Sequence, residues 1–136
     1  MTLSETTWSR VFLIKGVYNI VVSLVLLIWA RELLPLFGAP AGNPAYPQMF
    51  LLLCLAFGVG YCWVGLDIDS NTGIAVMGII GQCSVFAVVT VQWRAGTVYN
   101  PALISGTIDL AFAIAFAVFL WMHVYQPHRA PAEHGR

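Results

Sequence analysis

A few polar side chains that could take part in binding or catalysis lie inside long apolar stretches of this chain. They are Lys15, Asn19, Gln82 and Asp109. An ionised carboxylate alone in apolar surroundings is costly, so Asp109 must be paired, hydrogen-bonded, hydrated or protonated. Two interpretations follow. Asp109 and Gln82 form a structural hydrogen bond between helices, or Asp109 takes part in binding a ligand, a proton or an ion.

Residue counts along a helix predict that three of these side chains share one layer. Asn19 and Gln82 lie about 12 and 13 Å along their stretches from one side, and Asp109 lies about 18 Å from that side. Lys15 is shallower, at about 6 Å. Its side chain either extends outward to a polar surface or is linked to Asp109 indirectly, through Asn19, Gln82 or water.

The elements that position these residues are four apolar stretches in a chain that is 60% apolar and 9% charged. They run over Val11–Ala30, Gln48–Leu66, Gly73–Val91 and Ala102–Val124. About 20 helical residues cross the hydrocarbon core of a bilayer, which is about 30 Å thick. The longest connection, 17 residues, leaves no room for a domain outside the membrane. The sequence predicts an all-α polytopic membrane protein, a four-transmembrane-helix bundle in one domain over residues 1–136.

Several chemistries are disfavoured by what the apolar stretches lack. Cys54, Cys62 and Cys83 form no C-x-x-C, the motif that a membrane disulfide oxidoreductase needs. No histidine lies at mid-depth, which argues against haem with two histidine ligands and against a carboxylate-bridged metal centre. The zero net charge gives no sign of nucleic acid. We expect no catalytic residues, no metal site and no nucleic-acid partner.

Two further patterns predict helix faces. A row of small residues at i, i+4 and i+8 favours close packing against another helix. It consists of Cys54, Gly58 and Cys62. An aromatic run in the last stretch is expected to face lipid. It consists of Phe112, Phe116 and Phe119.

Charges outside the helix centres predict the orientation. An even number of spans places both termini on one side, and basic residues favour the cytoplasmic side. That side carries Arg10, Lys15, Arg129 and Arg136, and the other carries Arg31 and Arg94. We expect both termini in the cytoplasm and location in a bacterial inner membrane.

Short motifs along most of the chain resemble a known group of proteins. They are Tyr18-Asn19, Phe37-Gly38-Ala39-Pro40, Asp67–Asn71, Gly78–Gln82 and Ile108-Asp109-Leu110. The chain resembles small bacterial four-helix inner-membrane proteins and, more loosely, the DoxX-like group. The resemblance implies membership of that fold. Some DoxX-like members are small subunits of quinone-linked sulfur oxidation complexes, and no catalytic residues are carried over.

Two classes of function are consistent with these observations. The first is a non-enzymatic accessory subunit, or binder of a quinone or lipid-like molecule, in which the polar layer fixes packing or one headgroup. The second is a minimal proton- or cation-coupled transporter of small molecules, acting as a homo-oligomer through Asp109. Membrane lipid is the expected partner in both cases, with a homo-oligomer or a larger membrane complex as the assembly.

Overall fold

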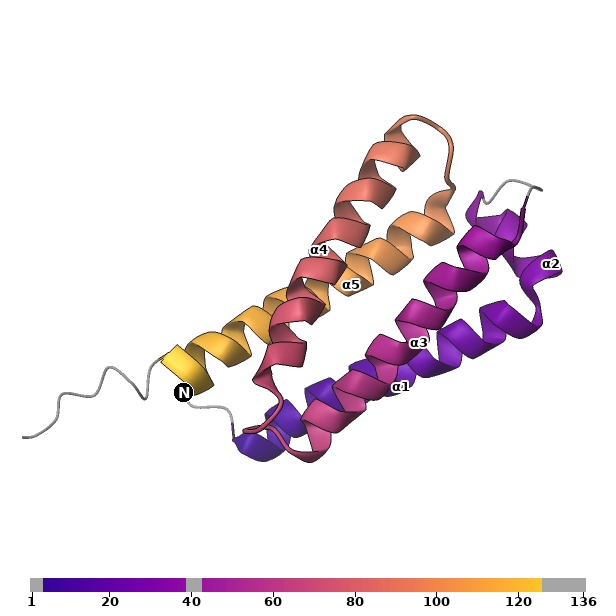
Figure 1. Cartoon of the computed structure of the whole chain (residues 1–136). Helices are drawn as coiled ribbons and strands as arrows, with labels where there is room; N and C mark the ends of the chain where they lie inside the picture. Colours follow the sequence, from indigo (N-terminus) through magenta and orange to yellow (C-terminus); the bar gives the residue numbers. More distant parts are fainter. Residues whose placement is uncertain (1–3, 39–42, 126–136) are drawn as a thin grey trace, which may run out of the picture.

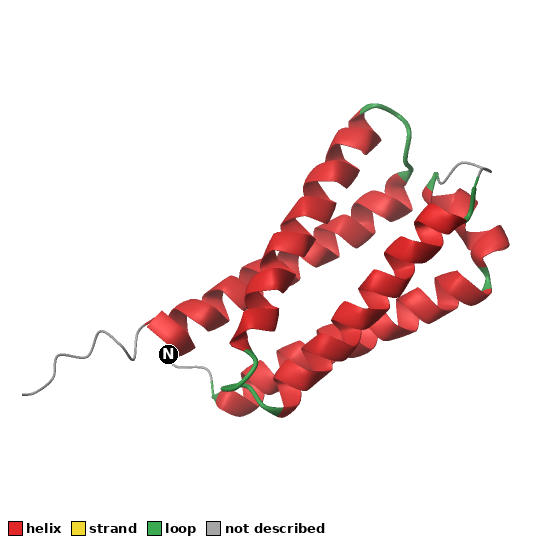
Figure 2. Cartoon of the chain, viewed as in Figure 1, coloured by secondary structure: helices red, strands yellow, loops and turns green. Residues whose placement is uncertain are grey.

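The computed structural model describes residues 4–38 and 43–125, and all its regular elements there are helices (Figures 1 and 2). The long ones are α1 (Glu5–Ile28), α3 (Ala45–Leu66), α4 (Thr72–Arg94) and α5 (Asn100–Leu120). The short ones are α2 (Ala30–Leu33), the 3-10 helix η1 (Leu34–Phe37) and the π-helical turn η2 (Trp121–Tyr125). The four long helices are long and apolar enough to cross a membrane. The chain is therefore an all-α membrane protein built as a four-helix bundle, as the sequence predicts.

The largest difference from the predicted spans is at the start of α1. The helix begins at Glu5, six residues before the predicted Val11, because the polar residues that precede the apolar stretch continue the same helix. It ends at Ile28, where Trp29 leaves helical geometry at φ −106° and ψ 38°. The other long helices begin one to three residues before the predicted starts. Pro47 and Pro101 lie in first turns, where a backbone N–H has no helical partner to lose.

The long helices pack as two antiparallel pairs. α1 lies along α3, and α4 lies along α5, while contacts between the two pairs are much fewer. Figure 1 shows the pairs meeting at the end where α1 begins and diverging toward the end where α2 lies. The end where the pairs meet is called the closed end below, and the end where they diverge is called the open end.

The α1 and α3 pair is held by close approach of small residues. A Cβ atom added at Gly58 would lie 3.0 Å from the Gly16 carbonyl oxygen and 3.1 Å from the Asn19 Cβ. One added at Gly16 would lie 2.8 Å from the Cys62 backbone nitrogen. This confirms the prediction that the row containing Gly58 and Cys62 makes a close helix contact.

The buried core occupies the closed end and contains aromatic side chains from three helices. Phe12 of α1 stacks on Phe116 of α5 with ring centroids 4.2 Å apart, and Phe116 meets Tyr61 of α3 at 5.1 Å. Phe116 and Phe119 are fully buried. The prediction that the aromatic run faces lipid is therefore wrong for these two residues, and Phe112 is half-buried. Since lipid chains are as apolar as a core, hydropathy alone does not distinguish the two environments.

At the open end, η1 connects the two pairs. The Tyr99 N–H donates to the Phe37 carbonyl oxygen at 3.2 Å. Gly38 adopts φ +86°, and a Cβ there would lie 2.7 Å from the Cα of Val98. Only glycine suits both this left-handed backbone and this close approach. The segment after α1 is thereby packed against the turn between α4 and α5.

Candidate functional site: a buried ion pair at the inner end of an apolar cavity

Lys15 and Asp109 form a direct ion pair between α1 and α5. Lys15 Nζ donates to Asp109 Oδ1, and the Lys15 side chain is 0% exposed while that of Asp109 is 19% exposed. The ammonium also lies 4.9 Å from the ring centroid of Tyr18 and 5.2 Å from that of Phe112. Aromatic faces attract a cation at these distances. Lys15 is therefore enclosed by a carboxylate and two rings.

This geometry corrects both sequence-based interpretations of Lys15. The side chain neither extends to a polar surface nor depends on an intermediate residue or water to meet Asp109. The error came from counting depth from Val11, where the apolar stretch begins, instead of from the start of the helix. Counted from Glu5, Lys15 lies ten residues, or about 15 Å, along the helix instead of about 6 Å. Lys15 thus belongs to the same mid-depth layer as Asp109.

Gln82 of α4 contacts Tyr61 of α3. Gln82 Nε2 donates to the Tyr61 hydroxyl at 2.9 Å, and both residues are buried. The Gln82 carbonyl oxygen has no hydrogen-bond partner among the described residues. The proposed direct bond between Gln82 and Asp109 is absent from the described part of the chain. Sequence reasoning missed Tyr61, although a tyrosine deep in an apolar helix signals a hydroxyl that needs a partner.

Asn19 of α1 is half-buried and faces α3. Its Nδ2 donates to the Cys54 carbonyl oxygen at 3.4 Å, a long hydrogen bond. One helical turn further along α1, the Ser23 side chain is buried. Both therefore add polar groups to the inside of the bundle at the level where the helix pairs begin to diverge.

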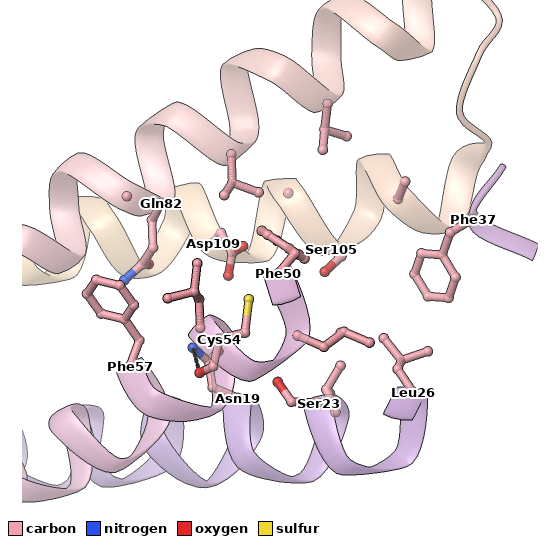
Figure 3. Close-up of a pocket in the computed structure, with 18 of the residues that line it drawn as sticks. Asn19, Ser23, Leu26, Phe37, Phe50, Cys54, Phe57, Gln82, Ser105 and Asp109 are labelled. Atoms are coloured by element: carbon pink, nitrogen blue, oxygen red, sulfur yellow. Dashed lines mark hydrogen bonds between the residues drawn. The ribbon is translucent and has the colours of Figure 1, made fainter. Parts of the chain in front are cut away.

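A cavity of about 460 Å³ lies between the two helix pairs and brings most of these residues together (Figure 3). Its polar lining residues are Tyr18, Asn19, Ser23, Cys54, Tyr61, Gln82, Ser105 and Asp109. The rest is largely apolar, with residues such as Phe50, Leu53, Phe57, Val85 and Val89. Lys15 is the one residue of the predicted site that does not line the cavity. Leu34 and Phe37 of η1 line the end away from the closed core.

An apolar cavity with a few fixed polar groups at one place is the usual form of a small-molecule site. The polar groups can orient a head, and the apolar walls can hold a tail. Within the described residues, no group of three histidine, cysteine, aspartate or glutamate side chains is placed to hold a metal ion. The site is therefore suited to binding an amphiphile by hydrogen bonds and apolar contact.

No protein-family model, curated protein or solved structure matches the chain. The DoxX-like resemblance stays a prediction, and the function is argued from the site alone.

Proposed function

We propose that the protein is a non-enzymatic membrane component that binds a lipid-like or quinone-like molecule in the cavity between its helix pairs. The polar head would lie at the layer of Gln82 and Asp109, and the apolar tail would follow the diverging helices. An accessory role in a larger membrane complex is compatible with this binding. The observation that carries the proposal is an apolar cavity lined by a few polar groups, with Gln82 and Asp109 toward its inner end (Figure 3).

We infer that the cavity also opens toward the outside of the bundle between α3 and α4, from the exposure of residues that line it. Phe50 and Leu53 of α3 line the cavity and are at the same time 47% and 61% exposed. Across from them, a Cβ atom added at Gly81 of α4 would meet nothing within 4 Å. In a bilayer such an opening faces hydrocarbon, so an amphiphile can reach the site without leaving the membrane.

The alternative is a proton- or cation-coupled transporter, and the observation that favours it is the charge of Asp109 inside a bundle of apolar helices. The position of Lys15 argues against it. The lysine occupies one oxygen of the carboxylate, so an arriving cation must compete with a fully buried ammonium. We therefore prefer a structural role for the ion pair and a binding role for the cavity.

We further propose a bacterial inner-membrane location with both termini in the cytoplasm, supported by the four-against-two distribution of lysine and arginine. A reporter enzyme active only in the periplasm should be silent when fused to the C-terminus and active when inserted between α4 and α5. The reverse pattern would invert the orientation. In the proposed orientation, the end of the cavity that is lined by η1 lies toward the outer leaflet.

Photo-cross-linking tests the binding role. Two amphiphiles with a diazirine in the tail, one with a quinone head and one with a hydroxyl head, are added to the protein in lipid nanodiscs. We expect at least one to label Phe50, Leu53 and Val85, because these residues line the cavity. Gly81→Leu should reduce the labelling several-fold by filling open space, whereas Ala87→Leu, at an exposed site on the same helix, should not.

Even labelling of all lipid-facing helix surfaces by both probes would contradict the proposal. Equal labelling of the cavity residues in Gly81→Leu and Ala87→Leu would also contradict the proposal. The two variants add the same side chain to α4 and differ in whether it enters the cavity. A difference between them therefore reports on occupancy of the cavity.

A further inference from the structure

We infer that the head of the bound molecule is a neutral hydroxyl, as in a long-chain alcohol, a phenol or a hydroquinone. The inference rests on the proposed binding function and adds the chemical class of the ligand. It follows from which hydrogen-bonding groups at the inner end of the cavity already have partners. Among the described residues, Asp109 and Gln82 there have acceptor oxygens without donors, and the cation beside them is enclosed.

Asp109 is the first acceptor without a full set of donors. A carboxylate paired with an ammonium has two acceptor oxygens and no donor, and each oxygen can accept more than one hydrogen bond. Lys15 contacts Oδ1, and no other hydrogen bond to this carboxylate is found over residues 4–38 and 43–125. Asp109 lines the cavity and is partly exposed there. A carboxylate in apolar surroundings is stabilised by a further O–H donor, and a ligand can supply it.

Gln82 is the second acceptor. Its amide nitrogen is used by Tyr61, and its carbonyl oxygen is buried without a partner in the described structure. Gln82 comes from α4 and Asp109 from α5, and Figure 3 shows both side chains at the same end of the cavity. Two independent side chains therefore offer an acceptor in the same place. The hydroxyls of four other lining residues can both donate and accept, so they do not favour either kind of head; these residues are Tyr18, Ser23, Tyr61 and Ser105.

The charges of Lys15 and Asp109 limit the net charge that the head of the ligand can carry. Lys15 does not line the cavity, so an anionic head would meet the carboxylate without reaching the ammonium. A cationic head would lie beside a carboxylate whose charge Lys15 already balances, close to a like charge. A neutral donor avoids both costs. The same reasoning disfavours an oxidised quinone, whose carbonyl oxygens only accept.

The test compares 4-decylphenol with 4-decylanisole, which has the same ring and tail but a methyl group in place of the hydroxyl hydrogen. Each competes with the cross-linking probe for the protein in nanodiscs. A hydrogen bond to a charged acceptor predicts that the phenol competes at least about tenfold better than the anisole. A titration against nanodiscs without protein corrects for the different partitioning of the two compounds into lipid.

Two variants assign the preference to residues. Lys15→Met/Asp109→Leu removes both charges together and should lower the preference for the phenol to less than about threefold, because the charged acceptor is lost. Ser105→Ala removes a cavity hydroxyl that can both donate and accept, so it should leave the preference for the phenol over the anisole unchanged. Gln82→Leu should lower it to an intermediate value and supplies the assignment if the double variant does not fold.

The outcomes separate this inference from the proposed function. Equal competition by phenol and anisole in the wild-type protein overturns the inference and leaves the binding function standing. Competition by neither compound, together with no cavity labelling, overturns the function. A tenfold preference that persists in the double variant and in Gln82→Leu overturns the assignment to the two acceptors.

Discussion

Removal of one partner from the Lys15–Asp109 pair should be among the most destabilising single changes in the bundle. Asp109→Asn leaves a fully buried ammonium without its carboxylate, and uncompensated buried charges cost about 3–5 kcal/mol. Lys15→Met leaves the Asp109 carboxylate without its cation, and because that carboxylate is partly exposed we expect the lower end of that range, about 3 kcal/mol. About 3 kcal/mol changes an equilibrium constant by roughly two orders of magnitude.

The double variant Lys15→Met/Asp109→Leu should recover most of this loss. Apolar side chains of similar size can replace a buried pair with little change or even a gain in stability, because neither charge must be desolvated. We expect its free energy of unfolding to lie within about 1 kcal/mol of the wild-type value. The effects of the two single changes should therefore be strongly non-additive.

Reversible unfolding in mixed detergent micelles, followed by circular dichroism, measures these free energies. Arg10→Met is the matched control, since it removes an exposed cation from the same helix and should change stability by less than about 0.5 kcal/mol. The reasoning is refuted if Lys15→Met and Asp109→Asn are as mild as Arg10→Met. It is also refuted if the double variant loses the sum of the two single losses.

The remaining predictions concern packing. Gly58→Leu should cost about 1–3 kcal/mol by overpacking the contact between α1 and α3, whereas Gly73→Leu, where an added Cβ would meet nothing within 4 Å, should be tolerated. Thermal unfolding in detergent compares the stability of the two variants. Equal stability would contradict the close contact at Gly58. Phe116→Ala should cost about 3–5 kcal/mol because the ring is fully buried, and Ile114→Ala, 58% exposed on the same helix, should cost much less in the same assay. Equal losses at both positions would indicate that Phe116 is not a core residue.

The number of long helices and their approximate bounds could be predicted from hydropathy, because a bilayer requires helices of a certain length and apolar character. The apolar stretch beginning at Val11 did not mark the start of α1, since Thr6, Thr7 and Ser9 precede that stretch and are part of the helix. Counting depth from Val11 placed Lys15 too shallow and hid its contact with Asp109. Counting residues gives depth along a helix, whereas a contact between two helices also depends on their rotation and crossing.

The candidate site, too, could be predicted from the sequence only in part. Residue type identified Asn19, Gln82 and Asp109, because polar groups in apolar helices are few and need partners. The sequence did not indicate that Tyr61, and not Asp109, is the partner of Gln82. It also did not distinguish the core ring of Phe116 from a lipid-facing one, because both environments are equally apolar.

The opening between α3 and α4 determines what ligand binding competes with. A cleft that faces the interior of a bilayer is in contact with acyl chains, so a ligand that enters it exchanges places with a lipid. The displaced chain and the arriving tail are both apolar, and the gain from burying one is largely cancelled by releasing the other. Selectivity then falls mainly on the polar head and the few groups that meet it. Occupancy of the site then depends on the mole ratio of ligand to lipid within the membrane. Lengthening the tail should increase partitioning of the ligand into the bilayer far more than it increases occupancy of the site at a given mole ratio.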